Sequence, residues 1–163
     1  MEETNKARIA FARKKARLLL EEIEIKQPPV ILNTIIQYLK KTQSLLVQKW
    51  ALGDHTDGIQ VTVGEEAVIG YNDDRHLNRK RFTVAHEIGH LILGHTQQNY
   101  DSDNKNIDHI EANQFAAELL MPLEMLKQDI KIIKNVKELA KKYIVSEEAM
   151  WKRLMDCKLI SRI

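Results

Sequence analysis

The feature that most constrains this chain is the pentapeptide His86-Glu87-Ile88-Gly89-His90, which lies within Arg81–Gly94. On an α-helix, residues i and i+4 lie on one face, so His86 and His90 can direct two imidazole rings at one metal ion. Glu87 projects beside them, where its carboxylate can take a proton from a water at the metal. Zn²⁺ suits this set best, because it accepts neutral imidazole and carboxylate in tetrahedral geometry and has no redox chemistry.

The residues around the pentapeptide favour the helix that such a site requires. Apolar side chains surround the motif, Thr83 is a predicted N-cap, and Gly94 is a predicted C-terminal stop. Without a metal, the same five residues could instead be a surface glutamate and two hydrogen-bonded histidines at a helix edge. The spacing predicts a metal-binding helix that is buried in a small domain.

Length and composition limit the class of protein. A chain of 163 residues is long enough for one domain with a hydrophobic core, with or without a small appendage. Its net charge of +2 does not by itself indicate nucleic-acid binding. The single Cys157 excludes an internal disulfide framework and favours a reducing cytoplasm. The charged start of the chain does not resemble a signal peptide, and no apolar run is long enough for a membrane span. We therefore expect a cytoplasmic protein.

The hydrophobic pattern predicts an α+β fold that is mostly helical. A small three-stranded, mainly antiparallel sheet is expected before the motif, with Gly64-Glu65 as a tight turn between two of its strands. Before the sheet we predict two helices, and after the motif a polar loop, over 95–106, followed by three more helices. The predicted helices besides the motif helix are Glu2–Ile25, Val30–Lys40, Ile107–Leu120, Val136–Lys142 and Ser146–Met155.

We predict three segments: an N-terminal helix over residues 1–29, a core over 30–125 and a C-terminal helical segment over 126–163 packed on that core. The last two helices resemble a helix-turn-helix pair. Ser146 is a predicted N-cap. Glu147 and Glu148 at the start of the second helix would repel phosphates, so we expect packing or partner recognition there rather than direct DNA binding.

A zinc site with an open position needs a third protein ligand. His95 would project away from His86 if the helix continued, so it is the weaker choice, although a loop could bring it close. A carboxylate from a second helix is the other solution. Glu111 follows His90 by a gap that lets the chain return antiparallel, and alanines beside it allow close helix packing. The remaining candidates on this segment are Glu118, Asp108 and His109.

Two sequence blocks carry a resemblance to a known family. They are RFTVAHEIGHLILGH and, after a short gap, EANQFAAELLMP. In this order and spacing they closely resemble the ImmA/IrrE family of gluzincin-like metallopeptidases, strongly over residues 58–122. The resemblance implies a zincin-like core that binds Zn²⁺ through His86, His90 and Glu111, with Glu87 as the catalytic general base. The N-terminal helix has no counterpart in this resemblance.

The resemblance also implies a function. Members of this family are specific endopeptidases that cut a helix-turn-helix repressor and so relieve repression of a mobile element, prophage or stress regulon. The expected partner is therefore such a repressor, as substrate. The alternative is a non-catalytic module with a metal-containing or degenerate site, a sensor or toxin–antitoxin component that sequesters a protein partner. An intact Glu87 favours the peptidase.

Some supporting roles stay open at this stage. A second oxyanion donor is usual in such sites, and the flanking candidates are His76, His95 and Tyr100. Asn113, shortly after Glu111, is either a hydrogen-bond partner of a ligand or a helix-packing residue.

Overall fold

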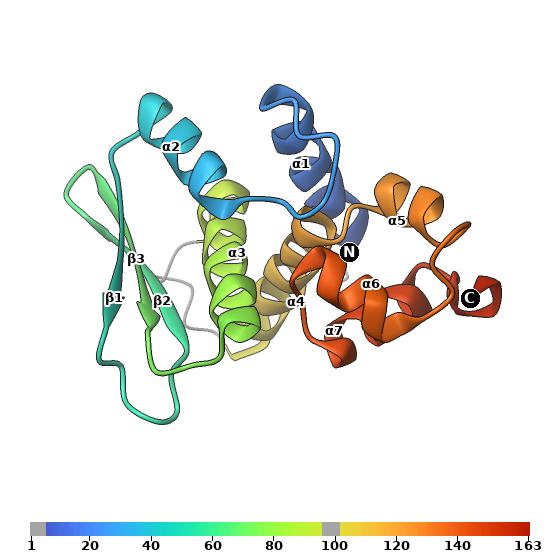
Figure 1. Cartoon of the computed structure of the whole chain (residues 1–163). Coiled ribbons are helices and arrows are strands. Elements are labelled where there is room, and N and C mark those ends of the chain that lie inside the picture. The colour runs from blue at the N-terminus through green and yellow to red at the C-terminus, as the bar shows by residue number, and fades with distance from the viewer. Residues whose placement is uncertain (1–5, 96–101) are drawn as a thin grey trace.

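The structure is a computed structural model that describes residues 6–95 and 102–163, without the side chains of 102–105. Within these residues the chain forms seven α-helices, a three-stranded sheet and a short C-terminal 3₁₀ helix, η1 (Ile160–Arg162), which is the predicted α+β fold. The sheet lies at one side of the molecule and α3 (Leu77–Leu93) covers it. Helix α4 (Ser102–Leu120) packs on the other side of α3 (Figure 1).

The sheet contains the three predicted strands but is mixed rather than antiparallel. Its strands are β1 (Leu45–Trp50), β2 (Gly58–Val63) and β3 (Glu66–Asn72), in the order β1-β3-β2. The predicted turn at Gly64 joins β2 and β3 into an antiparallel hairpin. β1 occupies the opposite edge of β3 and pairs with it in parallel. The prediction of a mainly antiparallel sheet is corrected in this respect, because β3 lies between two strands that run in opposite directions.

The connection between β1 and β2 explains how these strands reach opposite edges. The chain crosses the end of the sheet over residues 51–57 and is fixed there by Asn72, a buried residue at the end of β3. The Asn72 side-chain amide donates to the carbonyl oxygens of Gly53, at 2.8 Å, and Thr56, at 3.3 Å. Two carbonyl groups of this loop therefore have hydrogen-bond partners without a neighbouring strand.

Helix α3 begins earlier than predicted. It starts at Leu77, with His76 as its N-cap, whose ring accepts a hydrogen bond from the Asn78 backbone N–H. Thr83 is buried in the middle of the helix, so its prediction as the N-cap was wrong. The charged residues Arg79, Lys80 and Arg81 lie in the first turns of the helix. The predicted stop is correct, because Gly94 ends α3 in the left-handed conformation that glycine adopts without strain.

Helix α4 also begins earlier than predicted, at Ser102 rather than Ile107, and ends before Pro122 as expected. Its alanines allow the close approach to α3 that the sequence suggested. A Cβ atom added at Gly89 would lie 3.2 Å from the Ala112 carbonyl oxygen and 3.3 Å from the Ala112 Cα atom. The two helices therefore approach closely at the centre of the motif, which brings the side chains of α4 to the face of α3 that carries His86 and His90.

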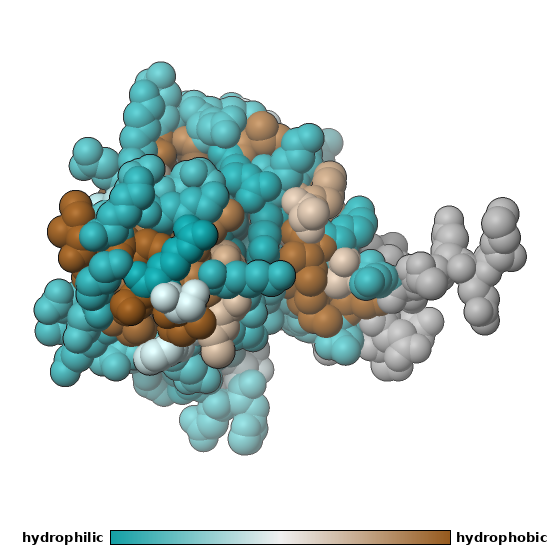
Figure 2. All heavy atoms as spheres, turned by 90° about the vertical axis from the view of Figure 1, so that its right-hand side faces the viewer, coloured by the Kyte–Doolittle hydropathy of each residue, from teal (hydrophilic) through white to brown (hydrophobic). Residues whose placement is uncertain are grey.

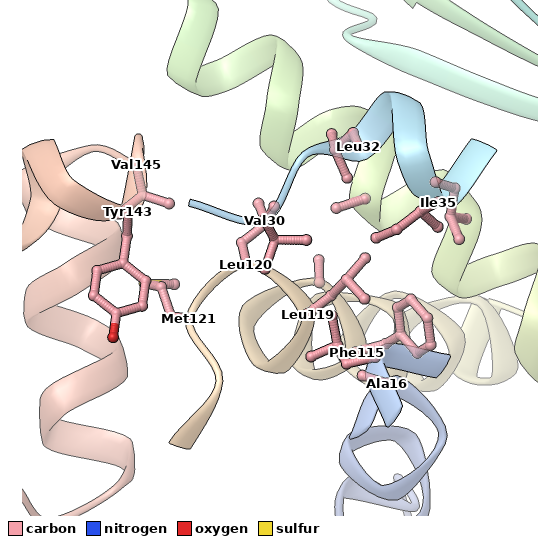
Figure 3. Close-up of a cluster of buried hydrophobic side chains, with 14 of the residues drawn as sticks. Ala16, Val30, Leu32, Ile35, Phe115, Leu119, Leu120, Met121, Tyr143 and Val145 are labelled. Carbon is pink, nitrogen blue, oxygen red and sulfur yellow. The ribbon is translucent and has the colours of Figure 1, made fainter. Parts of the chain in front are cut away.

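Helix α1 (Ile9–Glu22) packs on α4, far from it in sequence. It is shorter than the predicted Glu2–Ile25 helix, because Lys6 to Arg8 are not helical; residues 1–5 lie outside the described part. Ala16 of α1 faces Phe115 and Leu119 of α4 in a fully buried cluster (Figure 3). Val30 and the start of α2 (Leu32–Thr42) close this cluster from above. The core that supports the site is thus built from segments at both ends of the chain.

The C-terminal helices form a separate layer beside α4 (Figure 1). They are α5 (Leu123–Asp129), α6 (Val136–Tyr143) and α7 (Glu147–Asp156), and the last two match the predicted pair. Ser146 is the N-cap of α7 as predicted, since its hydroxyl accepts from the Ala149 N–H. The face that these helices present is mainly hydrophilic, with separate hydrophobic areas (Figure 2). None of the helices in the described residues combines the length and the apolar composition that a membrane span requires.

Candidate metal centre

Three histidine rings converge at the contact between α3 and α4. The Nε2 atoms of His86 and His90 lie 3.0 Å apart, as expected for one turn of a helix. His109, on α4, directs its Nδ1 atom to the same point, 3.1 Å from His86 Nε2 and 3.4 Å from His90 Nε2. Among the histidines, cysteines and acidic residues that the structure describes, these three histidines form the group whose ligand atoms lie close enough together to hold one metal ion.

The spacing of these nitrogen atoms fits a tetrahedral ion. Metal–nitrogen bonds of about 2.0–2.1 Å place tetrahedral ligand atoms about 3.3 Å apart. Burial lowers the pKa of His86 to about 4 and that of His90 to about 3, and the neighbouring histidines add to both shifts. Both rings are therefore neutral at pH 7, which is the form that binds metals. A cation between the rings would satisfy the lone pairs that they turn toward one another.

The ring of His86 is oriented from α4. Its Nδ1 atom lies 2.8 Å from Oδ1 of Asn113. An amide oxygen only accepts, so His86 Nδ1 carries the proton and its Nε2 lone pair faces the group of three. Asn113 thus has the supporting role that was one of its two predicted interpretations, and it fixes the tautomer that a metal ligand needs.

Glu87 lies between α3 and the sheet. It is 8% exposed, and burial raises its pKa to about 7. The close approach of β2 confines it: a Cβ atom added at Gly58 would lie 3.2 Å from Glu87 Oε1 and would collide with the Thr83 methyl group. Only a glycine fits at this first position of β2. The carboxylate is therefore placed one residue along the helix from the histidine face, against the edge strand.

The second nitrogen of His90 leads away from the three histidines to a buried carboxylate. His90 Nδ1 lies 2.9 Å from His95 Nδ1, and His95 Nε2 lies 3.0 Å from Glu111 Oε2. Glu111 is 1% exposed. Burial alone would raise the pKa of Glu111, but hydrogen bonds from Arg8 and His95 lower it to about 2. A fixed negative charge therefore stands two hydrogen bonds behind His90.

The structure brings together only part of the predicted ligand set. His86, His90 and Glu87 lie where the sequence placed them. Glu111 is not among the three converging side chains, because its oxygen atoms contact Arg8 and His95. Its prediction as the third ligand stays a hypothesis. The reserve candidate Glu118 forms an ion pair with Arg153 instead.

The candidate oxyanion donors are dispersed. His76 caps α3 at the end remote from Gly94, and His95 lies behind His90, with 6% of its side chain exposed. Tyr100 lies outside the described residues.

His109 was only a minor candidate in the sequence, although it precedes Asn113 by four residues and therefore shares its helix face. No sequence pattern around Arg8 indicated that it contacts the site.

Comparison with protein families shows which family this chain belongs to. The model of the IrrE N-terminal-like domain, a peptidase family, matches residues 41–155. This chain belongs to the IrrE N-terminal-like peptidase family. The match contains α3 and α4 and therefore the whole group of three histidines. The family is a metallopeptidase-like domain, which agrees with a metal ion at these histidines. No curated protein matches the sequence.

Among solved structures, the chain is similar to a Mycobacterium tuberculosis transcriptional regulator, with a TM-score of 0.65 and 14% identity. The match covers 89% of this chain and 46% of the regulator, so this chain spans about half the length of that protein. At this identity the likeness concerns the fold alone. It extends beyond the family-matched residues, since 89% of the chain exceeds the share that lies within 41–155.

Proposed function

We propose that this member of the IrrE N-terminal-like family is a zinc-dependent endopeptidase. The observation that carries the proposal is the convergence of three ring nitrogens, 3.0–3.4 Å apart, beside the buried carboxylate of Glu87. Neutral imidazoles and an open fourth position are the ligand set of catalytic zinc.

In this proposal His86 and His90 hold the metal together with a ligand from α4. The geometry favours His109 as that ligand, because its Nδ1 atom already faces both other rings. The family resemblance favours Glu111 instead, which would have to leave Arg8 and His95 to reach the metal. The two hypotheses make different predictions for single variants at these positions.

A zinc ion held by these residues would supply a Lewis acid that polarises the scissile carbonyl and lowers the pKa of a water molecule. Glu87 would take one proton from the attacking water as the water oxygen forms a bond to the carbonyl carbon. As the carbon–nitrogen bond breaks, Glu87 delivers this proton to the leaving amine. Asn113 holds His86 in the required tautomer throughout.

The surroundings of Glu87 favour an extended peptide as substrate. β2 is an edge strand of the described sheet, and its first residue, Gly58, lies against Glu87. A substrate segment that added to this sheet edge would pass the carboxylate. A groove of about 450 Å³ between α3 and α7, lined in part by Thr83, Phe82 and Ala149, could receive its side chains.

We propose a helix-turn-helix repressor as the substrate, so that cleavage relieves repression of a mobile element, prophage or stress regulon. The resemblance to the ImmA/IrrE family is the main support. The similar solved structure is that of a transcriptional regulator, which is compatible with a role in gene control. The proposed site of action is the cytoplasm, consistent with the single cysteine.

The test compares wild-type protein with Glu87→Gln, and with Glu124→Gln as an exposed control on α5. Each protein is incubated with helix-turn-helix repressors from the same genome, and products are identified by mass spectrometry. We expect a single cut with wild type and Glu124→Gln, and no cut with Glu87→Gln, which should retain one zinc ion per chain by elemental analysis. Full relief of repression by Glu87→Gln in a reporter strain would refute peptidase action and favour a sequestering module.

A further inference from the structure

The N-terminal segment reaches the metal centre although it lies outside the family-matched residues 41–155. Arg8, directly before α1, makes three contacts with Glu111 of α4. Its backbone N–H donates to Glu111 Oε1 at 2.7 Å, its Nε to the same atom at 2.9 Å, and its Nη2 to Oε2 at 2.8 Å. The guanidinium group therefore binds both carboxylate oxygens in a bidentate ion pair, the geometry in which arginine binds carboxylates most strongly.

The donors and acceptors can be assigned along the series of hydrogen bonds that joins Glu111, His95 and His90. An ionised carboxylate only accepts, so His95 donates to it from Nε2. His90 turns its Nε2 atom toward His86 and His109, and this atom needs its lone pair to bind a metal, so the proton of His90 lies on Nδ1. His90 Nδ1–H then donates to His95 Nδ1, 2.9 Å away.

We propose that Arg8 is a positioning residue for the metal centre. By holding the Glu111 carboxylate in place, it fixes the ring of His95 and, through it, the orientation and tautomer of His90. A carboxylate behind a metal-binding histidine also increases the basicity of the ligand. The helix that follows Arg8 is thus a functional part of the site. This inference rests on the proposed function only in that a metal occupies the three histidines.

The same helix interface provides a matched control. Arg13, on α1, donates from Nε and Nη2 to Gln114 Oε1 of α4, at 2.9 and 2.7 Å. The two arginines therefore tie the same pair of helices together. The contact of Arg8 continues into the histidines through Glu111, whereas Arg13 ends on a neutral amide. An effect of α1 docking alone would appear in both variants, and an effect on the metal centre only in Arg8→Ala.

The test measures zinc affinity by competition with a chromogenic chelator, in the full chain without substrate. We expect Arg8→Ala to weaken zinc binding by about tenfold, and Arg8→Lys by less, since partners behind a ligand typically contribute 10–100-fold. Arg13→Ala should keep wild-type affinity. In a Glu111→Gln background, Arg8→Ala should cause no further loss, because the connection is already broken. The visible absorption of the cobalt-substituted protein should shift in Arg8→Ala and stay unchanged in Arg13→Ala.

Wild-type zinc affinity and cobalt absorption in Arg8→Ala would overturn the inference and leave the proposed function standing. Equal losses in Arg8→Ala and Arg13→Ala would also overturn it, since they would indicate helix docking alone. The inference is likewise wrong if Arg8→Ala weakens binding as much in the Glu111→Gln background as in wild type. A wild-type protein that binds no zinc would overturn the proposed function as well.

Discussion

Helix α4 carries two buried carboxylates, Glu111 and Glu118, that differ in what their arginine partners connect them to. They lie two turns apart, each is 1% exposed, and each contacts an arginine of the N-terminal segment. Glu111 continues through His95 toward the metal-binding rings. Glu118 instead pairs with the buried Arg153 of α7 and accepts from the backbone N–H of Leu123, which anchors the C-terminal helices.

The comparison shows that burial and an arginine partner do not define the role of a carboxylate. By burial and by their ion pairs with the N-terminal segment alone, the two side chains cannot be distinguished. The two carboxylates differ in a further partner. His95 connects Glu111 to the rings of the proposed metal site, whereas a second arginine, Arg153, connects Glu118 to the C-terminal helices. Variants at the two positions should therefore separate stability from metal binding.

The largest effect is expected at Glu118. Glu118→Gln leaves Arg153 as a buried charge without a counter-charge at its former partner, which typically costs about 3–5 kcal/mol in the free energy of unfolding. Chemical denaturation of the metal-free protein measures the loss, and Glu124→Gln, on the exposed face of α5, should change it by less than about 0.5 kcal/mol. The zinc affinity of the folded fraction should not change. A loss of affinity as large as that of a ligand variant would erase the distinction between the two carboxylates.

The next effect distinguishes the two hypotheses for the third metal ligand. If His109 binds the metal, His109→Ala should weaken zinc binding by more than about 100-fold, and Glu111→Gln by about 10–100-fold. The reverse order would identify Glu111 as the ligand and imply that it leaves Arg8 when the metal binds. Chelator competition with both purified variants decides between these outcomes.

Asn113 lies between the two carboxylates on α4 and serves the other ring. Asn113→Ala removes the acceptor of His86 Nδ1–H, so we expect about a tenfold loss of zinc affinity. Asn113→Asp retains an acceptor and should restore most of it. Both variants should unfold close to the wild-type denaturant midpoint. An unchanged affinity in Asn113→Ala would show that α4 orients only His90.

The smallest effect is expected at the C-terminal layer. Ser146→Ala removes the N-cap of α7 and should lower the free energy of unfolding by about 1 kcal/mol. Zinc affinity should be unchanged. Ser146→Asp, which can also cap, should restore stability. If Ser146→Ala impaired zinc binding, the C-terminal helices that Glu118 anchors would affect the metal centre as well as stability.

Local patterns predicted most of the fold, and the errors concern signals that conflict locally. Strand alternation predicted β2 and β3, and Gly94 and Ser146 marked a helix end and a helix start correctly. The start of α3 was missed because charged residues preceded the motif, and Thr83 is a good cap in other contexts. The parallel pairing of β1 depends on where a seven-residue loop crosses the sheet, which no local pattern records.

The site divides in the same way. His86, Glu87 and His90 follow from helical spacing alone. The choice between His109 and Glu111 depends on which face of α4 meets α3, and that face is set by the contact between Gly89 and Ala112. Arg8 lies 103 residues from Glu111, so its part in the site follows only from the tertiary packing of α1.

The bond between Arg8 and Glu111 also has a thermodynamic consequence for the N-terminal helix. Linkage is reciprocal: if the docked Arg8 strengthens zinc binding by some factor, bound zinc strengthens the docking of Arg8 by the same factor. Zinc at one end of this chain of contacts would therefore slow amide hydrogen exchange in the first turn of α1. The metal content of the protein and the order of its N-terminus would then report on each other.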